Sequence, residues 1–374
     1  MHTMSLGGVV VLSVHQALLI SGAILMTDQN DIVMGASGEP TNPQRRKLLG
    51  QLLTGGAAVA AGAAFLSHED RILAEQLAKN PEGVKDPEVD ALSGASRTHT
   101  NWAKFADLKE PMATATIKGV KISKIIMGGN LIGGWAHARD LMYVSELVKA
   151  YHTRDKIIAT FKMGEACGVN TYLGHHSHIG IFEDYWEKAD GTMQYIADCS
   201  SLDGALHCAE KGAVAVYIQG ETNDHLVREG KFDEIVKFVE RFRQDDVPVG
   251  LGGHRIETIK ACVEKGIEPD FWMKTIHHGN YWSRHADKPE RDNVYDRQPE
   301  ETIAFMNTLK QPWIGFKVLA AGAIHPKDGF RYAFQAGADF LCVGMYDFQI
   351  VDDVNICMNI LQSDLKRDRP WCYT

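Results

Sequence analysis

The sequence lacks several features that would indicate particular classes of protein. Basic residues are in the minority, because 39 Lys and Arg stand against 48 Asp and Glu and the formal net charge is −9; this balance gives no support for nucleic-acid binding. The seven cysteines include no CxxC pair, so neither a disulfide framework nor a zinc-ribbon site is indicated. No GxGxxG run follows the first predicted strand, which removes the usual signature of a dinucleotide-binding domain.

The N-terminal part of the chain differs from the rest in composition. Arg45 and Arg46 precede an Ala- and Gly-rich apolar run from Leu52 to Leu66, an order typical of a twin-arginine export signal. We therefore predict a signal region over 1–66, a linker over 67–111, and a bacterial protein exported to the periplasm or tethered to the membrane, with transient membrane contact through the signal. A basic pair beside an Ala-rich helix and a membrane anchor are the alternatives, although the run is shorter than the roughly 20 residues that span a bilayer.

Residues 112–374 alternate short apolar segments with amphipathic ones, which predicts parallel α/β architecture. Eight such units indicate a (β/α)8 TIM barrel, and a doubly wound open sheet is the alternative. The predicted strands cover residues 122–127, 170–173, 193–198, 213–219, 248–251, 271–276, 314–320 and 340–344.

Polar side chains cluster where these predicted strands end. Active sites of (β/α)8 barrels lie at the C-terminal ends of the strands, so residues there are the candidates for binding a small-molecule substrate. For substrate binding they are Asn130, His137, Gln219, Glu221, His278, Trp282, Gly322 and Gly344. Trp282 lies on the long loop from His277 to Gln298, and loops of this length in compact barrels often act as lids.

Two lysines stand inside apolar segments near the end of the chain. Lys274 and Lys317 fall in the sixth and seventh predicted strands, where an ammonium is costly unless it is paired or neutral. A buried amine close to a second ammonium has a lowered pKa and can attack a carbonyl to form a Schiff base. Ion pairs with Asp198 or Glu221 are the alternative.

The same segments resemble the class I aldolases of the deoxyribose-phosphate type. The likeness covers Asp270 to Thr275, Phe316 to Ile324 and Ala336 to Gly344. It implies that Lys274 forms the imine, that Lys317 lowers its pKa and that Asp198 relays protons. Ala320 and Ala321 stand where that family has Ser-Gly in its phosphate grip, so a phosphorylated substrate is not implied.

A second resemblance concerns the first barrel segment. Ser123 to Gly129, Gly133 to Trp135 and Glu165 to Thr171 look like the start of an aldo-keto reductase. Asp198-Cys199 replaces that family's lysine and Gln219-Gly220-Glu221 replaces its histidine, so kinship of fold is implied without the proton relay. The barrel part also looks similar to uncharacterised exported barrel proteins of environmental bacteria.

A metal-dependent site is the main alternative to lysine chemistry. Imidazoles at successive strand ends can hold Zn²⁺ or Mn²⁺, and His175, His254 and His277 form the candidate set, with Asp198 or Glu221. No other cofactor is indicated.

We therefore predict an enzyme acting on a small, polar, sugar-like carbonyl compound by aldolase-like lysine chemistry, with Lys274, Lys317, Asp198 and His277 as the catalytic residues. The alternatives are a metal-dependent isomerase, epimerase or hydrolase, an aldo-keto-reductase-like oxidoreductase, and a ligand-binding barrel without activity. A homo-oligomer is compatible with each.

Overall fold

The computed structural model describes residues 102–135, 141–281, 283–284, 294–367 and 369–373. The predicted signal region and the linker up to residue 101 lie outside the described residues, and so do His137 and Trp282. Among the described residues, no helix is both long enough and apolar enough to cross a membrane.

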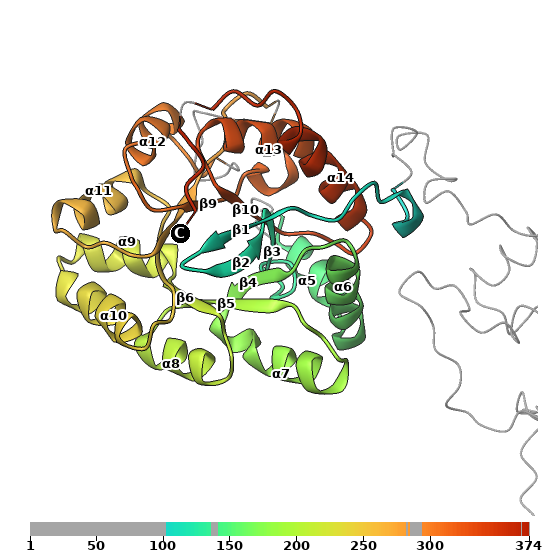
Figure 1. Cartoon of the computed structure of the whole chain (residues 1–374), viewed down its shortest axis with the longest axis horizontal. Helices are drawn as coiled ribbons and strands as arrows, with labels where there is room; N and C mark the ends of the chain where they lie inside the picture. The colour runs from blue at the N-terminus through green and yellow to red at the C-terminus, as the bar shows by residue number, and fades with distance from the viewer. Residues whose placement is uncertain (1–101, 136–140, 282, 285–293, 368, 374) are drawn as a thin grey trace, which may run out of the picture. The chain divides into compact units, whose positions relative to one another are not determined.

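Eight parallel strands close into a barrel, which confirms the predicted (β/α)8 fold (Figure 1). They follow one another around the ring in chain order, and the last pairs with the first. The strands are β3 (Ile125–Gly128), β4 (Thr171–His175), β5 (Gln194–Cys199), β6 (Ala215–Ile218), β7 (Val249–Gly253), β8 (Phe271–Thr275), β9 (Trp313–Phe316) and β10 (Phe340–Val343).

Helices cover the outside of this barrel because each presents an apolar stripe to the strands. The helix over 232–244 is an example, since it buries Ile235, Phe238, Val239 and Phe242. The helices are α5 (Tyr143–Tyr151), α6 (Arg154–Ala166), α7 (Ile179–Lys188), α8 (Leu202–Glu210), α9 (Gly220–Arg228), α10 (Phe232–Gln244), α11 (Ile256–Glu264), α12 (Pro299–Met306), α13 (Pro326–Gln335) and α14 (Ile350–Leu361), with short 3₁₀ turns η2 (Phe105–Asp107), η3 (His176–His178) and η4 (Ala320–Gly322).

Side chains alternate between the barrel interior and the layer under the helices, as the two-residue period of a strand requires. Leu173, Ile196, Tyr217 and Met273 belong to the cluster that fills the interior. Their strand neighbours, such as Trp272, belong to the second cluster, which lies between strands and helices. This alternation decides which polar residues reach the mouth.

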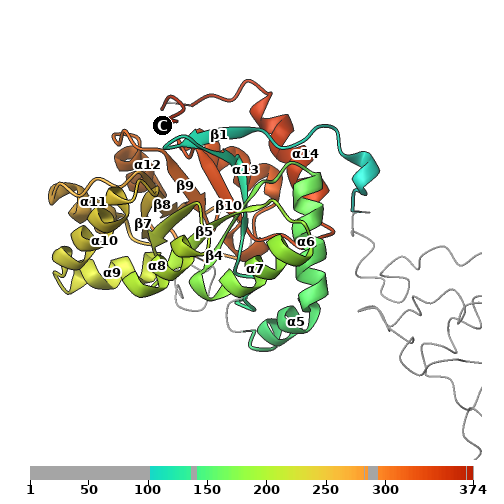
Figure 2. The same cartoon turned by 60° about the horizontal axis from the view of Figure 1, so that its bottom comes forward.

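A hairpin closes the end of the barrel where the strands begin. It consists of β1 (Thr114–Ile117) and β2 (Val120–Ser123), which lie across the centre of the ring in Figure 1. Lys118 and Gly119 in its turn have φ values of +46° and +76°, the left-handed pair that a tight two-residue hairpin needs. The predicted strand over 122–127 was therefore wrong in one respect: it spans the end of β2 and most of β3. Figure 2 shows the hairpin and α5 at opposite ends of the barrel.

Residues 102–111 pack along α14, although the predicted linker included them. Ala103 N–H donates to Asp352, Lys109 N–H donates to Asn355 at 2.9 Å, and the Asn355 amide donates to the Asp107 carbonyl. These contacts join the first described residues to the barrel.

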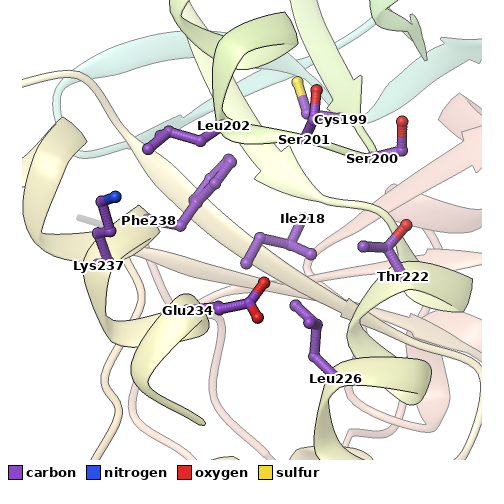
Figure 3. A pocket seen from close by; sticks show the side chains of 10 residues that line it. All are labelled: Cys199, Ser200, Ser201, Leu202, Ile218, Thr222, Leu226, Glu234, Lys237 and Phe238. Atoms are coloured by element: carbon purple, nitrogen blue, oxygen red, sulfur yellow. The ribbon is translucent and has the colours of Figure 1, made fainter. Parts of the chain in front are cut away.

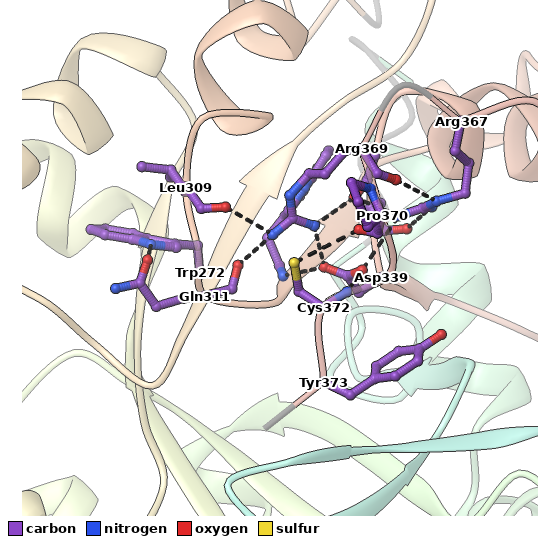
Figure 4. Close-up of polar contacts among 12 residues, drawn as sticks. Trp272, Leu309, Gln311, Asp339, Arg367, Arg369, Pro370, Cys372 and Tyr373 are labelled. Carbon is purple, nitrogen blue, oxygen red and sulfur yellow. Dashed lines mark hydrogen bonds and ion pairs between the residues drawn. The ribbon is translucent and has the colours of Figure 1, made fainter.

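The C-terminal segment is tied to the same end of the barrel through Asp339 (Figure 4). The carboxylate of Asp339 is fully buried and pairs with Arg369 at 2.6 Å and Arg367 at 3.3 Å. It also accepts the backbone N–H groups of Trp313 and Cys372. One buried charge thus joins β9, the start of β10 and the chain end.

We expect Asp339→Asn to lower the free energy of unfolding by about 3–5 kcal/mol, because it leaves buried arginines without their counter-charge. Urea unfolding followed by circular dichroism measures the change. Asp364→Asn, on an exposed residue of the same segment, is the matched control and should change the stability by less than about 0.5 kcal/mol. Equal effects of the two substitutions would contradict this account.

Candidate active site at the barrel mouth

Asp198 is the titratable group that β5 directs into the barrel. Its register partner on β6 is Tyr217, which belongs to the interior cluster, so both side chains point inward. Asp198 Oδ1 is buried and has no hydrogen-bond partner among the described residues. Burial raises the pKa of the carboxyl to about 7, and hydrogen bonds from the Tyr217 and Gln219 side chains oppose that rise. A carboxyl group that titrates near neutral pH is suited to taking up and returning a proton.

Two further inward-facing groups lie near the mouth. Thr275 Oγ1 on β8 is buried and lacks a hydrogen-bond partner among the described residues. The Cys342 thiol on β10 interacts electrostatically with Asp198, and burial raises its pKa to about 12, which keeps it neutral. An orphan hydroxyl and an orphan carboxylate oxygen are the groups that a polar ligand would satisfy.

His254, which follows β7, is oriented by a carboxylate. Its Nδ1 lies 3.1 Å from Asp224 Oδ2, and its backbone N–H donates to the same oxygen at 3.2 Å. Thr258 donates to the other oxygen of Asp224 at 2.6 Å. A carboxylate that holds Nδ1 leaves Nε2 to act on a substrate, which is the arrangement of an oriented acid–base or polarising imidazole.

Lys317 lies at the mouth but not within a strand, because β9 ends at Phe316. It has a left-handed φ of +58°, and its Nζ lies 4.3 Å from the centroid of the Tyr295 ring. Burial lowers the pKa of this amine to about 8, against the attraction of Glu221 and Asp224. At neutral pH a useful fraction of such an amine is uncharged.

Lys274 does not face the mouth. It follows Met273, an interior residue, and shares its side of β8 with Trp272, which packs under the helices. Its Nζ is fully buried and donates to the carbonyls of His254 at 2.9 Å and Thr275 at 2.7 Å. Burial lowers its pKa to about 8 and is the largest cause, with Asp296, Asp224 and Glu257 opposing. The Lys274 amine thus lies behind His254, on the outward side of β8.

His277 is held by the backbone on both ring nitrogens. Its Nδ1–H donates to the His278 carbonyl at 2.8 Å, and its Nε2 accepts from the N–H groups of Tyr295 and Asp296 at 2.9 and 3.0 Å. Burial lowers its pKa to about 4. Both ring nitrogens are therefore engaged within the protein, and His277 ties Tyr295 and Asp296 to the residues that follow β8.

His175 ends β4 beside Asp198, its register partner. Its Nδ1 lies 2.8 Å from Ser177 Oγ. The indole of Trp135 covers it edge-on at 5.3 Å between ring centroids and stacks on His178 at 5.6 Å. Trp135 is 44% exposed, so it forms an aromatic wall over this side of the mouth.

The proposed metal set is not assembled. Among the residues that the structure describes, no three His, Cys, Asp or Glu side chains are grouped so that they could hold a metal ion. His175 ends β4 and His254 follows β7, so β5 and β6 lie between them in the barrel. Both ring nitrogens of His277 are engaged. These residues therefore do not fit Zn²⁺ or Mn²⁺.

The remaining candidates for substrate binding follow the C-terminal ends of barrel strands. Gln219 is the residue before the first turn of α9, and its side chain hydrogen-bonds to Asp198. Glu221 is exposed on the first turn of that helix. Asn130 is exposed after β3, and His278 accepts the Asn280 N–H at 3.1 Å. Gly322 has a φ of +88° in η4, and a side chain at Gly344 would come within 3.3 Å of Leu131.

Sequence reasoning missed two groups that complete the site. Asp224 was overlooked because α9 carries few apolar residues and was not predicted as a helix. The available signal was a run of polar residues, Gln219, Glu221 and Asp224, directly after a predicted strand. Tyr217 was counted as a strand residue only, although alternation within β6 places it beside Asp198.

We expect Lys274→Met to lower the free energy of unfolding by about 2–4 kcal/mol, because two carbonyls lose their buried donor. Lys317→Met should change the stability by less than about 1 kcal/mol, since its partner is an aromatic face. Urea denaturation of both variants measures this contrast. A stable Lys274→Met protein would show that this amine is not structural.

Comparison with models of protein families and with curated proteins finds no match. Solved structures do resemble the chain. A putative aldo-keto reductase from Pseudomonas aeruginosa shares 13% identity and a TM-score of 0.48, covering 68% of this chain and 99% of its own. A 7,8-dihydropteroate synthase from Vibrio fischeri shares 14% identity and a TM-score of 0.39, covering 67% and 99%. A protein described as an aldolase shares 14% identity and a TM-score of 0.33, covering 56% and 92%. At these identities the likeness concerns the TIM-barrel fold alone.

Proposed function

We propose that this barrel is an enzyme that moves a proton on a small, polar, sugar-like carbonyl compound, with Asp198 as the acid–base group. The observation that carries the proposal is the inward carboxyl of Asp198, whose pKa is about 7 and whose Oδ1 has no hydrogen-bond partner within the described part of the chain. A protein pays for such a group in stability, so its presence in the barrel interior favours a chemical use.

The step that fits this group is removal of a proton from the carbon next to a carbonyl. Ionised Asp198 accepts the proton, the C–H electron pair forms a carbon–carbon double bond, and the carbonyl electrons move to its oxygen. Return of the proton from Asp198 to the former carbonyl carbon, while the hydroxyl proton of the first carbon passes to the former carbonyl oxygen, completes an isomerisation of a hydroxycarbonyl compound. Delivery of a proton by water to the opposite face of the first carbon completes an epimerisation, and Asp198 then releases its proton to solvent. No metal is needed if protein donors stabilise the enediolate oxygen.

Two mouth residues can supply that stabilisation. His254, oriented by Asp224, presents its Nε2, and Lys317 presents an ammonium above the Tyr295 ring. The Tyr217 hydroxyl and the Gln219 amide hold Asp198 in place. Trp135 offers a face on which a sugar ring can pack.

An imine on Lys317 is the second candidate, and the lowered pKa of its amine at the mouth favours it. Neutral Nζ attacks the carbonyl carbon, a proton passes to the carbonyl oxygen, and water leaves as the C=N bond forms. Asp198 then takes the proton whose removal accompanies carbon–carbon cleavage. In this second candidate mechanism the reaction is still that of a lyase, but the imine forms on Lys317 and not on Lys274.

The first test is deuterium exchange into hydroxyketones and aldo- and ketosugars in D₂O, followed by proton NMR. It detects proton abstraction whether the outcome is isomerisation, epimerisation or cleavage. We expect exchange with wild type, a rate that rises with pH up to about 7 because the base must be ionised, and a loss of at least about 100-fold in Asp198→Asn. Exchange that persists unchanged in Asp198→Asn would overturn the proposal.

Borohydride trapping separates the two versions of the chemistry. If an imine forms, reduction with a substrate present adds mass to the peptide that contains Lys317, and Lys317→Met abolishes the label. Lys274→Met is the matched control and should still be labelled. Exchange without any label supports simple acid–base chemistry.

The pKa of Asp198 also predicts how stability depends on pH. The native carboxyl titrates near 7 and the unfolded one near 3.9. The native state therefore holds the extra proton between these values, and stability falls as pH rises through this window. We expect Asp198→Asn to remove this fall, so that its melting temperature gains on wild type from pH 4 to pH 7. A difference between the two proteins that does not vary with pH would count against the raised pKa.

A further inference from the structure

A cavity of about 300 Å³ lies on the flank of the barrel, among β5, β6 and the helices α8, α9 and α10 (Figure 3). Ile218 and Cys199 border it from the outward faces of β6 and β5. Asp198 and Tyr217 point to the opposite side of the same strands. The cavity is therefore separate from the mouth, and its size is at the lower end of the range for small-molecule sites.

Its walls combine an apolar surface with a polar rim. Leu202, Ile218, Leu226 and Phe238 supply the apolar part. In Figure 3, Lys237 stands beside Phe238 at one side, and Ser200 and Thr222 stand at the other. A ligand for this space needs an apolar body between two polar ends.

The rim carries one carboxylate, Glu234, and one ammonium, Lys237. Glu234 pairs with Lys231 at 3.9 Å, whereas Lys237 has no carboxylate within ion-pair distance among the described residues. An exposed ammonium beside an apolar surface suits a carboxylate head group.

A hydrogen-bonded path leads from this cavity to Asp198. Thr222 Oγ1 lies at the cavity wall and donates to Gln219 Oε1 at 3.4 Å. Gln219 donates from its backbone to the Cys199 carbonyl at 2.9 Å, and its side chain hydrogen-bonds to Asp198. A molecule that bonds to Thr222 therefore competes with Gln219.

We propose that this cavity binds a short-chain carboxylate, with its head group on Lys237 and its chain along Phe238 and Leu226. The bound molecule then changes the hydrogen bonding of Asp198 through Thr222 and Gln219. The binding step stands alone, whereas its effect on turnover rests on the function proposed above. The chain end reaches Ser200 and Thr222, so a terminal hydroxyl there strengthens binding and the contact with Thr222.

Calorimetric titration of the full chain with hexanoate tests the binding step. We expect one saturable site, tighter binding of ω-hydroxyhexanoate, and binding of hexanol at least about tenfold weaker because it lacks the charge. Lys237→Met should weaken hexanoate at least about tenfold, and Lys237→Arg should retain it within about threefold. Leu226→Trp, which fills the cavity, should abolish it.

Hexanoate that binds equally to wild type, Lys237→Met and Leu226→Trp would overturn the proposal, and so would the absence of a saturable site. These readouts need no activity, so they stay interpretable if the proposed function fails.

Carbon-13 NMR of labelled aspartate tests the link to the mouth. We expect ω-hydroxyhexanoate to shift the pH at which Asp198 titrates, and we expect Thr222→Val to reduce that shift while binding stays within about threefold. Asp198→Asn identifies the resonance. A shift that Thr222→Val leaves unchanged, or no shift in a saturated protein, would refute the link.

Discussion

The alternation of side chains along each barrel strand is the constraint on which the rest of this site depends. A strand that ends in the mouth offers it only every second residue. On β5 this rule selects Asp198 and excludes Cys199, and on β8 it selects Thr275 and excludes Lys274. The register between strands then aligns His175, Asp198 and Tyr217 on one side of the sheet. The direction of each side chain, and not its residue type alone, therefore decides which groups are available at the mouth.

The fold was predictable from the sequence because eight apolar segments alternate with amphipathic ones, and closure needs only that pattern. The site was predictable in part: Asp198, His254 and Lys317 were correctly placed near strand ends. Lys274 was misplaced because a single apolar run does not reveal which residues face inward when both faces of a strand are buried. The contacts of His277 could not be predicted, because its partners are backbone N–H groups of Tyr295 and Asp296, which no motif encodes.

The buried carboxylates at the two ends of the barrel differ in how they are paired. At the closed end, Asp339 meets two arginines and two backbone donors, so its charge is fully matched. At the mouth, one oxygen of Asp198 has no hydrogen-bond partner among the residues that the structure describes, and burial raises the pKa of this carboxyl. The ion pairs of Asp339 hold the C-terminal segment in place. The buried carboxyl of Asp198 is costly in free energy, and a ligand that hydrogen-bonds to it would reduce that cost. The division agrees with the usual separation of stability and activity in this fold.

Lys274 shows how a residue outside the mouth can still shape it. Its ammonium holds the carbonyl of His254 from behind, while Asp224 holds the imidazole and the backbone N–H of the same residue from the side. With both its carbonyl and its ring held, the position of His254 is set before any substrate arrives, which lowers the cost of aligning it during a reaction. The resemblance to aldolases thus selected two lysines that differ in setting. The Lys274 amine is buried against backbone carbonyls, whereas the Lys317 amine lies above the Tyr295 ring at the mouth.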